Sequence, residues 1–167
     1  KSAVLINFSR GPIVDQDAVV AALEAGALRG YVCDFPTPEL NKHDHVVTLP
    51  HLGASTNEAE ENCAYMAAEE LRAYLEHGTI KNSVNFPDAE LLRSEGTSRI
   101  AIANSNVPNM VGQISTLVAG SGLNIADLLN KSRGELAYTL VDVEGDVPAT
   151  LLEQIRSIEG VLSARLI

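Results

Sequence analysis

Basic residues and long apolar runs are scarce in this sequence of 167 residues. It has 12 lysines and arginines against 22 aspartates and glutamates, so the net charge is −10 at pH 7. Binding to nucleic acid or to an anionic membrane surface depends mainly on basic charge, so neither is an expected partner. No apolar run approaches the roughly 20 residues that a membrane-spanning helix needs.

Cysteine is equally rare, and the two that occur, Cys33 and Cys63, do not form a C-x-x-C pair. A structural zinc site is therefore not expected, and no metal is predicted. Each cysteine lies in an apolar context, which favours two buried free thiols in a reducing, cytoplasmic compartment; a disulfide is the alternative. There is no N-terminal signal pattern, and strand-like residues begin almost at Lys1, which predicts a piece of a longer protein.

Residues 1–55 alternate between strand-like and helix-like patterns. Short apolar runs that end in turn residues are typical of buried parallel strands, and apolar residues at helical spacing indicate a helix. The predicted order is strand, helix, strand and strand, at 2–8, 17–24, 30–35 and 46–49. This order predicts part of a doubly wound, Rossmann-like parallel sheet of the α/β class.

Residues 56–97 are predicted to be a long connecting helix and a linker. Ser55 and Glu58 have the spacing of a capping box, and Gly78 can end the helix. Apolar side chains recur at helical spacing between them, at Ala59, Cys63, Ala67, Leu71, Tyr74 and Leu75. The residues after Gly78 mix glycine, proline, serine and charge, as connectors do.

Residues 98–167 show a second, compact pattern. Strands are predicted at 98–103, 125–129, 136–143 and 161–166, and the two helices lie after the first and third of them. The order βαββαβ is that of a ferredoxin-like fold. Because both helices cover one face of such a sheet, we expect the other face and the edge strands to be open, and the unit to form a homo-oligomer.

Three ionisable residues each follow a predicted strand of the first unit: Arg10, Glu39 and His51. Ligands of open parallel sheets bind outside the carboxyl ends of the strands, so these side chains are expected at one edge. Arginine can hold a carboxylate with a bidentate fork, and histidine can move a proton near neutral pH. A carboxylate beside the histidine favours the imidazolium form. This set suits a 2-hydroxy or 2-oxo acid; the alternative is three solvated surface residues.

The segments around these residues resemble motifs of the D-isomer-specific 2-hydroxyacid dehydrogenases. Residues 7–15 are similar to the arginine motif of that family, 34–39 to its Asp–Glu motif, and 49–56 to its histidine motif. Residues 98–167 resemble an ACT domain, a module that usually senses amino acids. With the link at 82–87, the combination is similar to the members of the family that oxidise 3-phosphoglycerate at the entry to serine synthesis.

The resemblance implies NAD as the cofactor, 3-phosphoglycerate as the substrate and a role for each catalytic residue. Arg10 should orient the substrate carboxylate and carbonyl, and His51 should act as general acid/base on the C2 oxygen. Glu39 should support the protonated form of His51. The residues expected to contact the cofactor or to line its pocket are Phe8, Ser9, Arg10, Asp34, His51, Leu52, Gly53 and Ala54.

Within the ACT-like unit, Asn104, Asn106 and Asn124 match positions that contact serine in some relatives. The resemblance therefore implies L-serine as an effector. Asparagine in turns is also common for structural reasons, which is the alternative. Asn109 stands where the family usually has glycine.

The dinucleotide fingerprint G-x-G-x-x-G is absent from the 167 residues. The near match at 120–122 follows a predicted helix and is better explained as a helix stop. Two alternatives to a phosphoglycerate-oxidising enzyme therefore stay open. One is an amino-acid-binding, dimerising ACT module without catalysis, and the other is a dehydrogenase for another 2-hydroxy acid. The choice between NAD and NADP also stays open.

Overall fold

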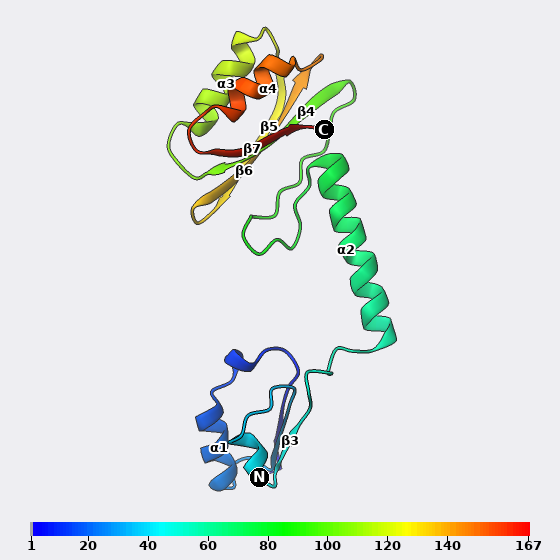
Figure 1. The fold of residues 1–167 in the computed structure, drawn as a ribbon, viewed down its shortest axis with the longest axis vertical. Helices are drawn as coiled ribbons and strands as arrows, with labels where there is room; N and C mark the ends of the chain where they lie inside the picture. Colours follow the sequence, from blue (N-terminus) through cyan, green and yellow to red (C-terminus); the bar gives the residue numbers. More distant parts are fainter. Residues whose placement is uncertain (1) are drawn as a thin grey trace. The chain divides into compact units, whose positions relative to one another are not determined.

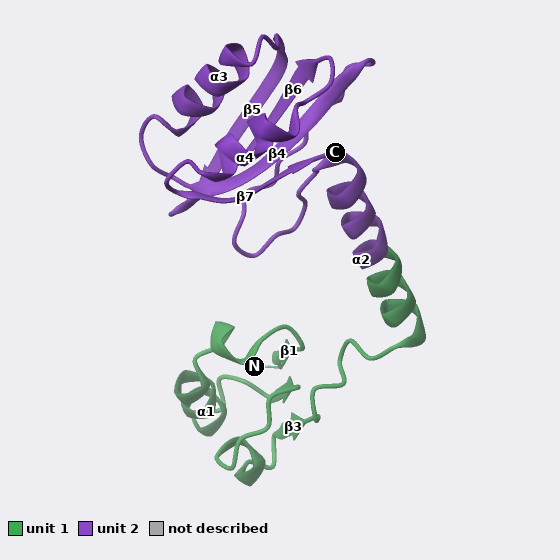
Figure 2. Cartoon of the chain, turned by 45° about the horizontal axis from the view of Figure 1, so that its top comes forward, with its two compact units in different colours: residues 1–65 green, residues 66–167 purple. Residues whose placement is uncertain are grey.

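The computed structural model describes residues 2–167, which fall into two compact units (Figures 1 and 2). The N-terminal unit extends to Tyr65, and the C-terminal unit comprises Met66–Ile167. The division lies inside helix α2 (Asn57–His77), where the sequence predicted a connecting helix. No helix among residues 2–167 is both long and apolar enough to cross a membrane.

The N-terminal unit is a small parallel sheet in the order β1-β2-β3. Its elements are β1 (Val4–Asn7), η1 (Gly11–Ile13), α1 (Gln16–Glu24), β2 (Gly30–Cys33), η2 (Leu40–Lys42) and β3 (Val46–Thr48). The predicted strands and helix are confirmed, although each strand is shorter than its apolar run. The Asp15 carboxylate caps α1 by accepting a hydrogen bond from the Ala18 amide at 3.0 Å. Its core joins α1 to the sheet through Val19, Leu23, Tyr31, Cys33 and Leu40.

The two cysteines differ in exposure, which corrects the prediction that both are buried. Cys33 is completely buried in β2, whereas Cys63 is exposed on α2, and both are free thiols. The reason is that α2 contains no buried residue, so the apolar side chains at helical spacing stay on its surface. Leu71, for example, is 57% exposed.

The C-terminal unit has the predicted βαββαβ order. Its elements are β4 (Thr97–Ser105), α3 (Met110–Gly120), β5 (Ile125–Arg133), β6 (Leu136–Glu144), α4 (Ala149–Arg156) and β7 (Val161–Leu166). The four strands are antiparallel and lie in the order β5-β6-β4-β7, so β5 and β7 are the edge strands. Strand β5 is longer than predicted because its polar end pairs with β6 as far as Arg133 and Leu136.

Helices α3 and α4 cover one face of this sheet, as Figure 1 shows. Alternate residues of the two central strands point toward them. The resulting core is fully or almost fully buried and includes Ile100, Ile102, Met110, Ile114, Val118, Val141, Val143, Leu151 and Ile155.

The opposite face of the sheet is covered too, which corrects the prediction that it is open. Ile80 and Ala89 form an isolated antiparallel bridge, and both pack against Ala101, Tyr138 and Leu140. The segment after α2, predicted as a simple linker, therefore builds a second apolar cluster. Its apolar residues interrupt a polar stretch, so no regular spacing marks them in the sequence.

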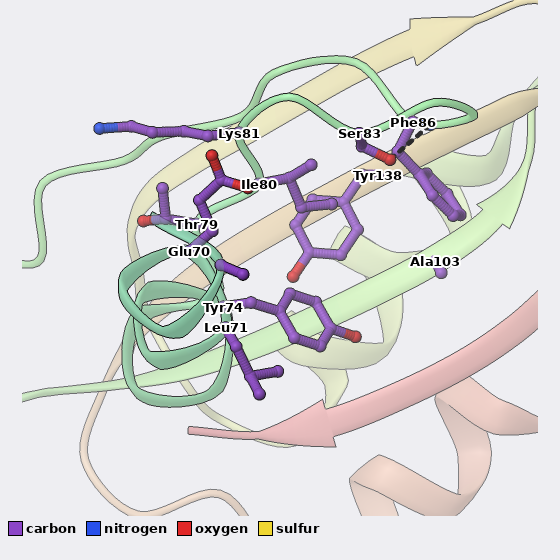
Figure 3. Close-up of a pocket in the computed structure, with 11 residues that line it drawn as sticks. Glu70, Leu71, Tyr74, Thr79, Ile80, Lys81, Ser83, Phe86, Ala103 and Tyr138 are labelled. Carbon is purple, nitrogen blue, oxygen red and sulfur yellow. Dashed lines mark hydrogen bonds between the residues drawn. The ribbon is translucent and has the colours of Figure 1, made fainter. Parts of the chain in front are cut away.

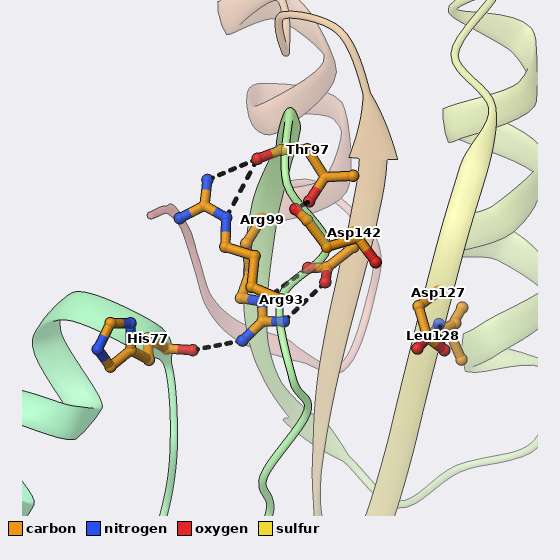
Figure 4. A network of polar contacts seen from close by, with 8 residues as sticks. His77, Arg93, Thr97, Arg99, Asp127, Leu128 and Asp142 are labelled. Carbon is orange, nitrogen blue, oxygen red and sulfur yellow. Dashed lines mark hydrogen bonds and ion pairs between the residues drawn. The ribbon is translucent and has the colours of Figure 1, made fainter.

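A buried ion pair fastens the end of α2 to this face (Figure 4). The Arg99 guanidinium donates from Nε and Nη2 to the two carboxylate oxygens of Asp142, each at 2.6 Å, and both side chains are completely buried. Its Nη1 atom donates to the carbonyl of His77 at 2.8 Å. Arg165 donates to the carbonyls of Tyr74 and Leu75, so two arginines satisfy the last turn of α2.

Candidate active site

The three predicted catalytic residues follow the carboxyl ends of three strands that pair in parallel. Asn7, at the end of β1, is opposite Cys33 of β2, and Cys33 is opposite Thr48 of β3. The ladder continues beyond the strands, since the Asp34 amide donates to Asn7 and the Leu49 amide to Cys33. The loops that carry Arg10, Glu39 and His51 therefore all leave the sheet at the same edge.

Asn7, which the sequence analysis did not select, shapes the loop that carries Arg10. Its side chain is 4% exposed; Nδ2 donates to the Arg10 carbonyl at 2.9 Å, and Oδ1 accepts from the Ser9 amide at 3.1 Å. Arg10 itself is exposed and spends one Nη1 donor on the Ser9 carbonyl, at 2.7 Å. The remaining N–H donors of the Arg10 guanidinium suit a carboxylate, and the hydrogen bonds of Asn7 hold the backbone of the loop. Asn7 could have been identified from the sequence because it is an asparagine at the end of an apolar strand.

Asp34 holds the turn that follows His51. Its carboxylate is 1% exposed and accepts hydrogen bonds from the amides of Leu52, at 3.1 Å, and Gly53. A Cβ atom at Gly53 would lie 2.7 Å from Cγ of Phe8, so this close approach requires glycine. The structure thus uses Asp34 to position the turn, whereas its predicted contact with the cofactor stays a prediction.

His51 combines an exposed ring with an unusual backbone conformation. Its φ angle is 60°, in the left-handed region, and its ring centroid lies 5.2 Å from that of Phe35. Residues held in this region cluster at functional sites, where the surrounding structure compensates for the strain. Here the compensation comes from Asp34 through the next two amides. An exposed imidazole on an anchored turn is suited to exchange a proton with a bound substrate.

Glu39 is exposed and immediately precedes η2, without a side-chain hydrogen bond that caps it. None of the ion pairs among residues 2–167 joins Glu39 to His51 or to Arg10. Glu39 is thus on the loop of the same sheet edge, and its support of His51 stays a prediction.

The edge offers surfaces that suit a nicotinamide ring. Phe8 is 40% exposed and Leu52 55%, and apolar side chains of this kind can cover an aromatic ring. The neighbouring residues predicted to contact the cofactor, Ser9 and Ala54, are exposed as well. Within residues 2–167, no group of three or more histidine, cysteine or acidic side chains is arranged to hold a metal ion.

The predicted effector residues do not gather within one copy of the chain. Asn104 and Asn106 are at the end of β4 that meets Leu136, whereas the Asn124 carbonyl accepts from the Glu144 amide at the other end of β6. The Asn106 side chain donates to the Gly134 carbonyl at 3.0 Å and so ties its loop to the β5–β6 turn. A site that includes all three asparagines would need two copies.

Asn104 is almost completely buried and already has partners. Its Nδ2 atom donates to the Ser105 carbonyl at 2.8 Å, and its Oδ1 atom accepts from the Thr139 hydroxyl at 3.2 Å. Asn130 donates to the same hydroxyl at 2.7 Å. Nearby, Asn109 has a φ angle of 64°, a conformation that asparagine tolerates better than most residues, which explains how it replaces a glycine.

Comparison with known proteins finds similarity to dehydrogenases. Residues 1–53 match the model of the NAD binding domain of D-isomer specific 2-hydroxyacid dehydrogenases. The D-3-phosphoglycerate dehydrogenase of Haemophilus influenzae is 34% identical over 178 aligned residues, which include 100% of this chain and 43% of that protein. The Escherichia coli K12 enzyme of the same name is 33% identical, over 99% of this chain and 43% of its own length.

Two solved structures resemble parts of the chain. A glyoxylate reductase from Paecilomyes thermophila is 29% identical over 48% of this chain and 26% of its own, with a TM-score of 0.42. The ACT domain of a GTP pyrophosphokinase from Chlorobium tepidum is 16% identical over 44% of this chain and 100% of its own, with a TM-score of 0.39.

The chain spans less than half the length of the curated relatives it matches. The family match coincides with the parallel sheet, and the similarity to the relatives continues through the antiparallel unit. Residues 1–53 are therefore similar to the NAD binding domain of D-isomer specific 2-hydroxyacid dehydrogenases, and the whole chain is similar to part of the D-3-phosphoglycerate dehydrogenases named above.

Proposed function

We propose that this chain is the part of an NAD-dependent D-3-phosphoglycerate dehydrogenase that carries the catalytic side chains and a regulatory ACT-like unit. The proposed reaction oxidises 3-phosphoglycerate to 3-phosphohydroxypyruvate in L-serine biosynthesis. The observation that carries this proposal is the common edge at which the loops of Arg10, Glu39 and His51 leave the parallel sheet. A cytoplasmic location is part of the proposal and is supported by the two free thiols.

Each residue has a chemical task in this reaction. The exposed Arg10 guanidinium binds the substrate carboxylate and orients C2, and His51 accepts the proton of the C2 hydroxyl. NAD held against the exposed Phe8 and Leu52 would supply the acceptor for the hydride of C2. Glu39 stabilises the imidazolium that results, and Asn7 and Asp34 keep the two loops in place through the hydrogen bonds described above.

A chimera tests the catalytic part of the proposal. In the Haemophilus influenzae relative, the 43% of the enzyme that aligns with this chain is replaced by residues 1–167. The chimera is expected to reduce NAD with 3-phosphoglycerate, and His51→Ala is expected to lower kcat by about 10²–10⁴-fold. His43→Ala, in the loop before β3, is the matched control and should leave kcat unchanged.

The substrate range of the same chimera decides between the alternatives. Faster turnover of glycolate or lactate than of 3-phosphoglycerate would indicate a dehydrogenase for another 2-hydroxy acid. A folded chimera without activity on any of them, or an unaffected His51→Ala variant, would contradict the proposed catalytic role.

The proposal for the C-terminal unit is a dimer through β5 that binds L-serine at its interface. Two β5 edges related by a two-fold axis pair antiparallel, which brings the start of one strand beside the end of the other. Asn124 of one copy would then be near the Asn106 loop of the second. Asparagine side chains offer both a donor and an acceptor to the carboxylate and ammonium groups of an amino acid.

Sedimentation of the chain with and without millimolar L-serine tests this arrangement. We expect a dimer that serine stabilises in a thermal shift assay, and Asn124→Ala and Asn106→Ala should each remove that stabilisation. Lys131→Ala, which removes a hydrogen bond to the Asp88 carbonyl, is a control for general damage to β5. A monomer at all concentrations would exclude the dimer, and a dimer indifferent to serine would exclude the effector.

A further inference from the structure

The imidazole of His51 packs against one neighbouring ring. Among residues 2–167 it forms no hydrogen bond or ion pair with another side chain, whereas the Phe35 ring lies 5.2 Å away between centroids, at an interplanar angle of 59°. The hydrogen bonds of Asp34 hold the backbone of the turn, but they do not fix the side-chain torsions of His51. Contact with Phe35 therefore decides where the nitrogens of the imidazole point.

Phe35 is itself firmly held. Its ring packs against the core of the N-terminal unit, and its backbone precedes Pro36, which favours an extended conformation. The loop beyond it is fastened as well, because the Thr37 hydroxyl donates to Oε1 of Gln16 at 3.2 Å and accepts from the Leu40 amide at 3.3 Å. A ring with two side-chain torsions on a restrained loop has few alternative positions.

The same ring lies against the loop of Arg10. A Cβ atom at Gly11 would be 3.6 Å from Cγ of Phe35, which is van der Waals contact. Phe35 thus lies between the loops that carry the proposed carboxylate-binding and proton-accepting groups. Because the Arg10 loop is also held by the two hydrogen bonds of Asn7, loss of the ring should release His51 more than Arg10.

We propose that Phe35 is a positioning residue, which holds the His51 imidazole in the orientation that accepts the proton of the C2 hydroxyl. The catalytic consequence rests on the proposed function, whereas the orientation of the ring is a property of the chain itself. A general base must be within about 2.6–3.2 Å of the group that gives up its proton, and a misplacement of about 1 Å can cost around 10²-fold in rate. An imidazole that rotates freely is turned away from the substrate for part of the time.

The orientation can be measured by NMR spectroscopy on the 167-residue chain, without substrate or cofactor. The couplings between Hα and the Hβ protons report the χ1 rotamers of His51. We expect one dominant rotamer in the unsubstituted chain and in Phe35→Tyr, which keeps the ring. Phe35→Leu keeps an apolar side chain without the ring and should give rotamer-averaged couplings. Averaged couplings in the unsubstituted chain, or one dominant rotamer in Phe35→Leu, would overturn the proposal.

Phe86→Leu is the matched control. Phe86 also precedes a proline and also pairs with an aromatic ring, that of Tyr138 in the C-terminal unit, at 6.1 Å between centroids (Figure 3). This substitution should leave the His51 couplings unchanged. A change as large as that in Phe35→Leu would mean that any lost aromatic pair loosens the chain, and would contradict a specific role of Phe35.

Kinetics of the Haemophilus influenzae chimera connect the orientation to catalysis. Phe35→Leu should lower kcat by roughly 10–100-fold while KM for 3-phosphoglycerate changes less than about threefold, and Phe35→Tyr should restore most of kcat. In the His51→Ala background, Phe35→Leu should cost less than about twofold more, because a residue that acts through His51 then has nothing to position. An equal loss of kcat in both backgrounds would contradict the positioning role.

The two measurements separate this inference from the proposed function. If the chimera is inactive, or His51→Ala leaves its kcat unchanged, while Phe35→Leu averages the His51 couplings, the proposed function fails and the orientation of the ring by Phe35 stands. If His51→Ala lowers kcat and Phe35→Leu does not, the proposed function stands and the positioning role is wrong.

Discussion

At the scale of single residues, short polar side chains decide how the proposed catalytic loops are held. Asn7 and Asp34 are both almost completely buried, and each satisfies backbone groups of the loop that carries a functional neighbour. A buried carboxylate that accepts two amide hydrogen bonds anchors a turn more firmly than an exposed ion pair does. The exposed Arg10 and His51 thus depend on buried neighbours that hold their loops.

Tyr138 gives a prediction about alkaline pH. Its burial, and then the nearby Tyr74, raise its pKa to about 12, against the opposing effect of Arg165. In the unfolded chain the phenol has a pKa near 10. The protonated phenol therefore contributes stability that is complete below pH 10 and is lost as the pH rises from 10 to about 12.

Urea unfolding followed by circular dichroism at pH 9 and pH 11.5 measures this loss. Over that range, Tyr138→Phe should lose less free energy of unfolding than the unsubstituted chain, by up to about 2 kcal/mol. Tyr65→Phe, 69% exposed on α2, is the control. Equal losses in all three proteins would show that Tyr138 does not resist ionisation.

At the scale of elements, the end of α2 is fixed by side chains from the C-terminal sheet. Arg99 joins β4, β6 and the last turn of α2, and Arg165 adds β7 and the face of the Tyr74 ring, 4.3 Å from its guanidinium carbon. Positive charge at a helix C-terminus also complements the helix dipole.

The buried pair of Arg99 and Asp142 predicts an asymmetric effect of substitution. Arg99→Met leaves the Asp142 carboxylate buried without its partner and should cost about 3–5 kcal/mol of unfolding free energy. Arg99→Met combined with Asp142→Leu removes both charges and should recover most of that loss. Arg72→Met, on the exposed surface of α2, is the control.

Thermal unfolding and urea titration of the three variants measure these differences. If the double variant is as unstable as Arg99→Met, the pair contributes through the Arg99 contact with His77 rather than through charge compensation.

At the scale of the whole molecule, the two units carry different parts of one proposed enzyme. The N-terminal unit has the loops of Arg10, Glu39 and His51, whereas these 167 residues contain no G-x-G-x-x-G turn to hold a pyrophosphate. We therefore expect the chain by itself to bind NADH no more tightly than millimolar and to show no turnover of 3-phosphoglycerate. Isothermal titration measures this, and micromolar affinity would contradict the expectation.

Periodicity in the sequence was sufficient to predict the strand and helix order of both units. Apolar runs at 2–8, 30–35 and 46–49 became parallel strands, and the βαββαβ pattern of 98–167 is confirmed. The motifs of the first 55 residues likewise pointed to the family whose model matches residues 1–53. These features are local, because the spacing of apolar residues, the turn residues and the motifs all involve residues that are close together in the sequence.

Only the tertiary structure decided what covers each surface and which polar groups meet. Nothing in the spacing of Arg99 and Asp142, or of Ile80 and Tyr138, predicts that they touch. The same limit explains the wrong predictions of a buried Cys63 and an open sheet face. Whether an apolar side chain is buried depends on segments distant in sequence that arrive on the same face, and a local pattern carries no information about them.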